Sequence, residues 1–304
     1  MMNILVTGAN GQLGQCLRDL AENDSENTWF WTDVAGIEGR NCDYLDITDA
    51  ESVKKYFVDN AISVCVNCAA YTNVDKAEED QEMAKKLNAD APKNLAEACN
   101  IHGTKLIHIS TDYVFNGTSF MPITEERMTL PISVYGKTKL EGEQNIINSG
   151  CKYLIFRTAW LYSEYGNNFV KTMMKLIREV HRDSINVVND QIGTPTYARD
   201  LADLIFGVVT KHSLKTGIYH FTNEGVCSWY DFARKIRDVL RTGYLAEVYG
   251  VTTKEYYGNK PHAPRPFYSV LSKEKVKKDF PDFFYARSWM DAVEVCVERL
   301  KHNG

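Results

Sequence analysis

The stretch Gly8-Ala-Asn-Gly11-Gln-Leu-Gly14 decides the fold, because it follows the apolar run Asn3–Thr7 and opens a helical pattern. Glycines at this spacing permit a tight turn and let a pyrophosphate approach the backbone. The N-terminus of the helix offers free N–H groups and a partial positive charge. The sequence therefore predicts a dinucleotide site at its first strand–helix junction.

Strands and helices alternate through the first half of the chain. After the first strand, apolar runs at 28–33, 63–70, 105–111 and 153–158 predict strands, and helical patterns at 11–23, 49–60, 76–100 and 134–147 lie between them. The third of these helices should break before Pro92. This alternation is typical of βαβ units, so we expect an α/β fold with a Rossmann-like doubly wound parallel sheet.

The pattern becomes less regular and more aromatic after residue 160. We expect residues 1–160 to form the dinucleotide-binding domain, with re-entrant segments from roughly 185–215, and residues 161–304 to form mainly a smaller C-terminal substrate-binding lobe. Helices are predicted at 169–181, 199–212 and 228–240, with strands at 185–188 and 217–222.

Composition narrows the possible ligands. The 304 residues are 44% hydrophobic and 25% charged, with a net charge of −5. A mildly acidic chain binds nucleic acid or anionic membranes poorly, so we expect neither partner. Apolar runs fall far short of a membrane span and no signal peptide is apparent, so we expect a cytoplasmic protein whose eight cysteines are reduced thiols.

Two aspartates are candidates for binding the adenosine part of the cofactor. Asp33 ends the second strand, where a carboxylate can accept hydrogen bonds from an adenosine ribose 2′-OH and so favours NAD over NADP. Arg40 lies close enough in sequence to serve a 2′-phosphate instead, so NADH and NADPH both stay open. Asp46 either lies beside the adenine or caps the helix that begins near Asp49.

A catalytic pair is predicted on the helix at 134–147. Tyr135 and Lys139 stand at i and i+4, so their side chains share one helix face. A neighbouring ammonium would lower the tyrosine pKa toward working pH, and such a tyrosine can donate a proton to a developing alkoxide. Thr111 ends the preceding strand, where its hydroxyl would project into the ligand crevice as a second donor.

Five segments in order resemble the extended short-chain dehydrogenase/reductase superfamily and, within it, the dTDP-4-dehydrorhamnose reductase family. They are TGANGQLG, NCAAYTNVDKAE, STDYVFNG, YGKTKLEGE and RTAWLYS. The later segments DQIGTPTYARDLAD and RPFYSVLS also resemble that family, so the likeness covers nearly the whole chain.

The resemblance implies a role for each matching residue. Those that would hold the cofactor are Gly8, Gly11, Gln12, Leu13, Gly14, Ala69, Ala70, Tyr71 and Lys139, with Thr111, Tyr135 and Lys139 as the catalytic set. Those that would face the substrate are Thr72, Val74, Asp75, Asp112, Tyr113, Trp160 and Arg265. From the residues alone, Trp160 fits the core equally well, Tyr113 fits packing under its loop, and Arg265 fits the surface.

The implied reaction is reduction of the C4 ketone of dTDP-4-dehydro-L-rhamnose by NADPH or NADH, with Tyr135 as proton donor. A homodimer is implied as well. Some family members bind a divalent cation through acidic side chains, but Gln15 and Gln191 stand where such residues would be expected, so we expect no metal. The alternatives are another nucleotide-sugar reductase or epimerase of the superfamily, and a noncatalytic dinucleotide-binding regulatory subunit.

Overall fold

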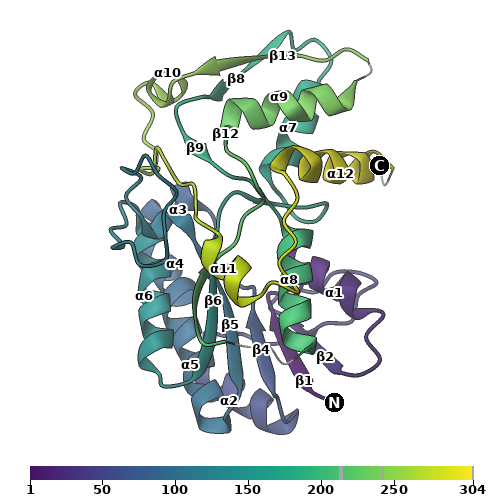
Figure 1. Cartoon of the computed structure of the whole chain (residues 1–304), viewed down its shortest axis with the longest axis vertical. Coiled ribbons are helices and arrows are strands. Elements are labelled where there is room, and N and C mark those ends of the chain that lie inside the picture. The colour runs from purple at the N-terminus through teal and green to yellow at the C-terminus, as the bar shows by residue number, and fades with distance from the viewer. Residues whose placement is uncertain (212–214, 242, 303–304) are drawn as a thin grey trace.

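A parallel sheet forms the centre of the computed structural model, which describes residues 1–211, 215–241 and 243–302 (Figure 1). Its strand order is β11-β6-β5-β4-β1-β2-β3, and every neighbouring pair is parallel. The strands are β1 (Asn3–Thr7), β2 (Thr28–Asp33), β3 (Asp43–Tyr44), β4 (Val64–Asn67), β5 (Lys105–Thr111), β6 (Lys152–Thr158) and β11 (Gly217–His220). The predicted Rossmann-like fold is confirmed.

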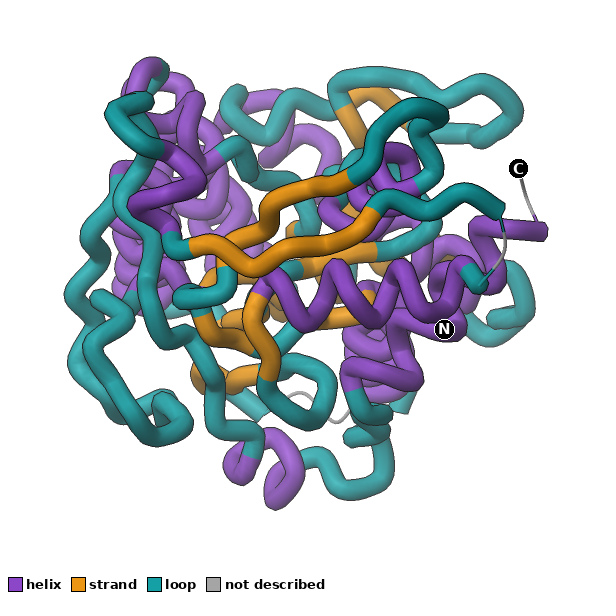
Figure 2. Tube along the Cα trace, turned by 90° about the horizontal axis from the view of Figure 1, so that it is seen from above, coloured by secondary structure: helices purple, strands orange, loops and turns teal. Residues whose placement is uncertain are grey.

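Helices cover both faces of this sheet because successive strand residues point to opposite sides. Ile4 and Val6 pack with α1 (Gln12–Ala21), α8 (Ala198–Thr210) and α11 (Glu274–Asp279). Leu5 packs on the other face with α2 (Ala50–Asp59), α5 (Ala91–His102) and α6 (Val134–Asn148). Viewed from above, strands lie in the middle with helices on either side, and the strand pair nearest the viewer belongs to the upper part of the chain and not to this sheet (Figure 2).

The helix predicted at 76–100 is divided differently from the prediction. It consists of α3 (Val74–Glu79), α4 (Gln81–Lys85), a π-helical segment Lys86–Asp90 and then α5. The predicted break before Pro92 is wrong, because Pro92 occupies the first turn of α5, where its missing N–H costs no hydrogen bond. The chain changes direction instead at Asp80, whose carboxylate accepts from the Met83 N–H.

The second half of the chain builds a separate hydrophobic core above the sheet. Its helices are α7 (Phe169–Ile177), α9 (Trp229–Leu240), α10 (Thr253–Tyr257) and α12 (Trp289–His302), and its strand pair is β8 (Ser184–Val188) with β13 (Glu247–Val251). Two shorter strand pairs are β7 (Leu161–Tyr162) with β10 (Thr196–Tyr197), and β9 (Ile192–Gly193) with β12 (Cys227–Ser228).

The chain returns to the sheet through α8 and β11. Within the re-entrant range of 185–215, α8 packs on α1 and β8 belongs to the upper pair with β13. The end of the helix predicted at 199–212 lies partly outside the described residues, since 212–214 are not described. The domain division at residue 160 stays a prediction.

The topology creates a crevice at one edge of the sheet. Strand β1 pairs with β2 on one side and with β4 on the other, so the strand order reverses there. Ligands of open α/β sheets bind at such a switch point, beyond the carboxyl ends of the strands.

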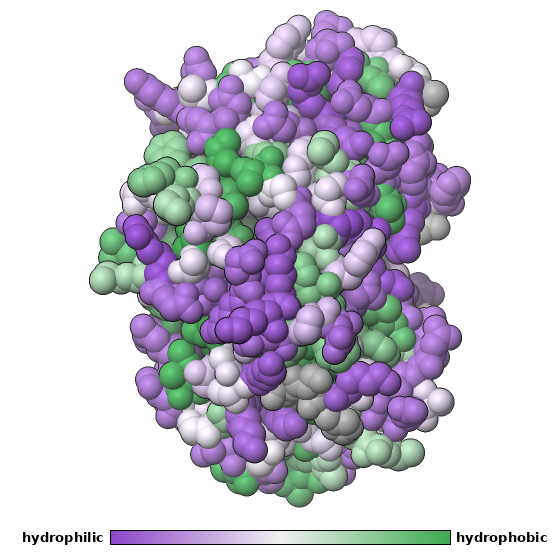
Figure 3. Space-filling model, viewed as in Figure 1, coloured by the Kyte–Doolittle hydropathy of each residue, from purple (hydrophilic) through white to green (hydrophobic). Residues whose placement is uncertain are grey.

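The surface in Figure 3 is mainly hydrophilic, with hydrophobic residues gathered in small areas. Within the described residues, no helix is both long and apolar enough to cross a bilayer.

Candidate active site

A cavity of about 780 Å³ lies over the switch point. It extends from the loop after β1 to residues of the upper core. Most of the predicted site residues line it: Gly8, Gly11, Gln12, Leu13, Asp33, Asp46, Ala69, Ala70, Thr72, Val74, Thr111, Asp112, Tyr113, Tyr135, Lys139, Trp160 and Arg265.

The glycine loop packs so closely against neighbouring backbone that Gly8 and Gly14 have no space for a Cβ atom. Gly8 has a φ of +65°, and a Cβ there would lie 2.5 Å from the Ala69 nitrogen. Gly14 lies in α1, where a Cβ would lie 2.6 Å from the Gly8 oxygen, so its role is packing of helix against loop. A dinucleotide fits this loop, because its pyrophosphate can meet the bare backbone at the N-terminus of α1.

Asp33 and Asp46 both border the cavity but differ in their hydrogen bonds. Asp33 accepts from the Asn10 N–H at 3.0 Å through one oxygen and from the Val34 N–H at 2.8 Å through the other. Asp46 accepts from the Thr48 hydroxyl at 2.7 Å. Arg40 does not line the cavity and pairs with Asp19 at 3.4 Å.

The side chain of Gln12 ties the glycine loop to the segment after β7. Its oxygen accepts from the Ser163 hydroxyl at 3.2 Å and from the Asn168 amide at 3.0 Å, and its nitrogen donates to the Leu161 oxygen at 3.4 Å. Gly166 and Asn167 of that segment also line the cavity. Gln12 therefore joins the two walls between which a dinucleotide would lie.

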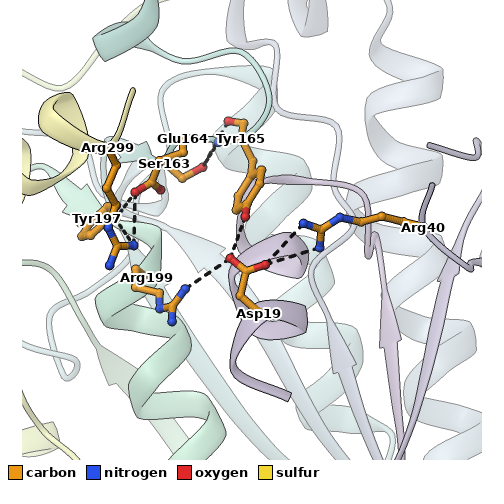
Figure 4. Close-up of polar contacts among 8 residues, drawn as sticks. All are labelled: Asp19, Arg40, Ser163, Glu164, Tyr165, Tyr197, Arg199 and Arg299. Atoms are coloured by element: carbon orange, nitrogen blue, oxygen red, sulfur yellow. Dashed lines mark hydrogen bonds and ion pairs between the residues drawn. The ribbon is translucent and has the colours of Figure 1, made fainter. Parts of the chain in front are cut away.

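A polar network fixes the same segment from outside (Figure 4). Asp19 of α1 accepts from the Tyr165 hydroxyl at 2.7 Å and pairs with Arg199 of α8 at 3.3 Å. Glu164 accepts from the Tyr197 hydroxyl and lies 3.5 Å from Arg299 of α12. The segment is thus anchored to helices on both sides.

Tyr135 reaches the cavity because the start of α6 is packed tightly. The Ser133 hydroxyl caps the helix by accepting from the Gly136 N–H at 3.1 Å. A Cβ at Gly136 would lie 2.2 Å from the Tyr113 oxygen. This close approach places the Tyr135 and Tyr113 rings edge to face, 5.4 Å apart.

The pKa of Tyr135 differs from the sequence prediction. We expected Lys139 to lower it, but burial raises the pKa of Tyr135 to about 12, against a smaller lowering by the Thr111 hydroxyl. The Lys139 ammonium instead donates to the Ile109 oxygen at 2.6 Å and lies 3.3 Å from the His108 ring. A phenol with a raised pKa stays protonated, which a proton donor requires.

Thr111 and Asp112 form a second polar pair at the end of β5. The Thr111 hydroxyl donates to the Asp112 carboxylate at 3.0 Å and accepts from the Tyr113 N–H at 3.2 Å. Burial raises the pKa of Asp112 to about 6. Among the described residues, no hydrogen bond within ordinary geometry reaches its other oxygen, Oδ2, although the Ser269 side chain is close enough to the carboxylate to oppose the rise in pKa. A carboxylate oxygen has two lone pairs, so Oδ2 can accept from a ligand hydroxyl.

Two tryptophans form an aromatic wall of the cavity. Trp160 and Trp229 stack with ring centroids 3.7 Å apart, and both line the cavity. Trp160 has a φ of +49°, a conformation that a bulky residue rarely adopts. The position after β6 predicted Trp160, whereas no local motif distinguishes Trp229.

Arg265 is held beside the cavity by Asp75, which does not itself line it. The two form a bidentate ion pair at 3.0 Å and 2.7 Å. Mainly through the hydrogen bond from Arg265, the pKa of Asp75 lies below its ordinary value. Val74, which precedes Asp75 at the start of α3, and Thr72, just before that helix, do line the cavity.

Tyr71 does not line the cavity, although its neighbours Ala70 and Thr72 do. Its backbone is held by Asn88 of the π-helical segment, which accepts from the Tyr71 N–H at 2.9 Å and donates to the Tyr71 oxygen at 3.1 Å. Several lining residues were not predicted, and most of them are apolar: Val34, Leu45, Ile47, Cys68, Leu87, Ile109, Ser110, Thr158, Ala159, Leu161, Gly166, Asn167 and Trp229.

A family model described as the RmlD substrate binding domain matches residues 2–302. The chain belongs to this family. This confirms the resemblance seen in the sequence.

Named relatives of this RmlD-family chain include two curated proteins. A probable dTDP-4,6-dihydroxy-2-methyloxan-3-one 4-ketoreductase of Streptomyces antibioticus is 41% identical, over 90% of this chain and 88% of its own. A dTDP-4-dehydrorhamnose reductase of Aggregatibacter actinomycetemcomitans is 38% identical, over 92% and 94%. The crystal structure of the dTDP-4-dehydrorhamnose reductase from Bacillus anthracis in complex with NADP is 37% identical, with a TM-score of 0.87 over 98% and 99% of the two chains.

Proposed function

We propose that this protein is a dTDP-4-dehydrorhamnose reductase. It reduces the C4 ketone of dTDP-4-dehydro-L-rhamnose to dTDP-L-rhamnose with NADPH or NADH. The observation that carries the proposal is one cavity that joins a bare glycine loop at the switch point to Thr111, Tyr135 and Lys139. The reductase names of relatives that align over most of the chain support the same chemistry.

The cofactor would lie across the carboxyl ends of the strands. Gly8, Gly11 and the backbone of Gln12 and Leu13 would hold its pyrophosphate, and Asp33 its adenosine ribose. When bound, a reduced nicotinamide supplies a hydride for the C4 carbon of the sugar.

Tyr135 delivers the proton that completes the reduction. Its buried phenol is protonated at neutral pH and transfers its proton to the oxygen of the former carbonyl. Lys139, one helical turn along α6, stabilises the phenolate that remains. Thr111 holds the same oxygen through its hydroxyl, which must turn away from Asp112 to do so.

Asp112 and the aromatic wall would orient the sugar. Oδ2 of Asp112 can accept from a sugar hydroxyl, while Trp160 and Trp229 offer an apolar surface to the 6-deoxy end. Arg265 would help to bind the diphosphate, for which a planar guanidinium is well suited.

A second substrate is favoured by the Streptomyces relative, whose name describes a 4-ketoreductase of a related dTDP-linked keto sugar. It shares the ketone chemistry and differs in the hydroxyls that the cavity must recognise. Asp112 is one residue that could distinguish the two.

The deciding experiment follows oxidation of NADPH and NADH with a panel of dTDP-linked 4-keto sugars. The proposal is supported if kcat/KM is highest with dTDP-4-dehydro-L-rhamnose. A higher kcat/KM with another keto sugar would identify that sugar as the substrate instead. Tight cofactor binding with no turnover on any of them would indicate a regulatory subunit. The homodimer and the cytoplasmic location stay predictions, to be checked by sedimentation and by cell fractionation.

A further inference from the structure

A buried chain of hydrogen bonds runs across the sheet behind the cavity and ends at Lys139. Thr7 of β1, Asn67 of β4 and His108 of β5 are direct register partners in neighbouring strands, so their side chains share one face of the sheet. The Thr7 hydroxyl donates to Asn67 at 2.8 Å, and Asn67 lies 3.1 Å from His108 Nδ1. The other ring nitrogen, Nε2, lies 3.3 Å from Lys139 Nζ.

The orientation of Asn67 is fixed by the backbone. The Ala69 N–H, which can only donate, lies 3.1 Å from Asn67 Oδ1. The amide oxygen therefore faces Ala69 and Thr7, and the amide nitrogen faces His108. Because an amide NH₂ donates, His108 Nδ1 must accept.

This orientation decides the tautomer of His108. A neutral imidazole that accepts at Nδ1 carries its proton on Nε2. Complete burial lowers the pKa of His108 well below its ordinary value, with a smaller contribution from Lys139, so the ring is neutral. The Nε2–H then points at Lys139 Nζ.

A donor aimed at Lys139 favours the neutral amine over the ammonium. An amine can accept the Nε2–H while it donates to the Ile109 oxygen, whereas an ammonium has no lone pair for His108. Burial also lowers the pKa of Lys139, to about 8, in the same direction.

The other titratable groups around Lys139 do not account for the preference for its neutral amine form. Glu143, one turn further along α6, opposes it, but its carboxylate is already engaged by Arg157 of β6 at 2.6 Å and by the Ser110 hydroxyl at 2.5 Å. Tyr135, one turn earlier, is a neutral phenol because its pKa is raised.

We propose that Asn67 and His108 are positioning residues: Asn67 holds His108 in the Nε2–H tautomer, and that N–H sets the protonation state of Lys139. The consequence for turnover rests on the proposed reductase function, whereas the tautomer and the titration of Lys139 do not. With a pKa lowered to about 8, Lys139 is still mainly an ammonium at neutral pH, where it can stabilise a phenolate, and it becomes an amine as the pH rises.

The first test is NMR of the whole chain labelled with ¹⁵N-histidine. His108 is assigned by its loss in the His108→Gln variant. We expect one proton, on Nε2, at every pH at which the wild-type chain is folded. A proton on Nδ1, or an imidazolium at neutral pH, would overturn the proposal.

The second test is the titration of Lys139, followed by ¹³C-lysine NMR and by the alkaline limb of kcat/KM. In His108→Gln the amide oxygen can accept from the Lys139 ammonium and so stabilises it. The Lys139 pKa and the alkaline limb of kcat/KM should therefore both move up by about one pH unit. Thr7→Val is the matched control, since it removes a hydroxyl from the same chain while Ala69 still orients Asn67, and it should leave both unchanged.

The outcomes separate the two proposals. An unchanged Lys139 titration in a folded His108→Gln protein, or an equal shift in Thr7→Val, would refute the role of His108. Absence of turnover with every keto sugar, together with the expected tautomer and titration, would refute the reductase alone. If His108→Gln fails to fold, His108 can be assigned with Thr7→Val and Asn67→Asp, and the wild-type tautomer decides.

Discussion

Arg265 donates from both terminal nitrogens to Asp75, over 3.0 Å and 2.7 Å, although 190 residues separate the two along the chain. The pair joins the first turn of α3 to the segment that follows α10. Two segments that are far apart in the sequence are therefore held together beside the cavity, with the Ala263 N–H also donating to Asp75 at 2.9 Å. The contribution of the ion pair to stability depends on pH.

Asp75→Asn should reduce stability at neutral pH but not in acid. Because the pKa of Asp75 is lowered in the folded chain, the carboxylate contributes stability above its ordinary pKa and loses it as pH falls through the lowered value. The side chain is 51% exposed, so we expect a loss below about 1 kcal/mol. Urea unfolding across this acid range measures it. Asp59→Asn, which removes a similarly exposed carboxylate paired with Lys55, is the control for the loss of a surface charge.

Tyr135→Phe should keep the fold and cofactor binding but lose about 10²–10⁴-fold in kcat, because the proton donor is removed. The loss is measured by oxidation of the reduced nicotinamide with the keto sugar. Tyr113→Phe removes a hydroxyl from the same cavity and should cost far less. Near-normal turnover of Tyr135→Phe would show that another group donates the proton.

Gly8→Ala should abolish dinucleotide binding and destabilise the chain. The new Cβ would meet both an unfavourable φ and the Ala69 backbone at 2.5 Å. Gly39→Ala is the matched control, since Gly39 has a φ of +77° and no atom within 4 Å of a Cβ. The control should lose only about 1 kcal/mol of unfolding free energy. Equal losses in the two variants would show that the close approach at Ala69 is unimportant.

Asp33→Asn should shift cofactor preference toward NADPH. The amide can still accept from the Asn10 N–H but no longer repels a 2′-phosphate. We expect the ratio of kcat/KM for NADPH to that for NADH to rise about tenfold, which corresponds to ~1.4 kcal/mol. Asp46→Asn removes a second charge from the cavity wall and serves as control. A similar change in both variants would attribute the effect to net charge alone.

The sequence was sufficient for the parts of the site that follow directly from strands. Gly8, Thr111 and Trp160 each stand at or just after the end of a strand, so the edge of the sheet places them together. The Tyr135–Lys139 spacing also placed both on one helix face. These positions depend on local geometry that a short segment determines.

Features that depend on distant contacts could not be predicted in this way. The position of Trp229 depends on stacking against Trp160, and the partner of Arg265 lies in the other half of the chain. The pKa of Tyr135 follows from burial, which the i, i+4 spacing does not report. His108 was part of an apolar strand pattern, and its role emerges only once Asn67 and Lys139 are adjacent to it.

The return of β11 to the edge of the sheet limits how the protein can be cut. A fragment that ended at residue 160 would leave one edge of β6 without its partner β11, although β5 would remain on the other edge, and would uncover the apolar face beneath α8. Such a bare edge invites aggregation. During synthesis, the nucleotide-binding half therefore cannot complete its sheet until the residues of β11, which begins at Gly217, have been made. Any shortened or fused version of the protein should keep the two halves in one polypeptide.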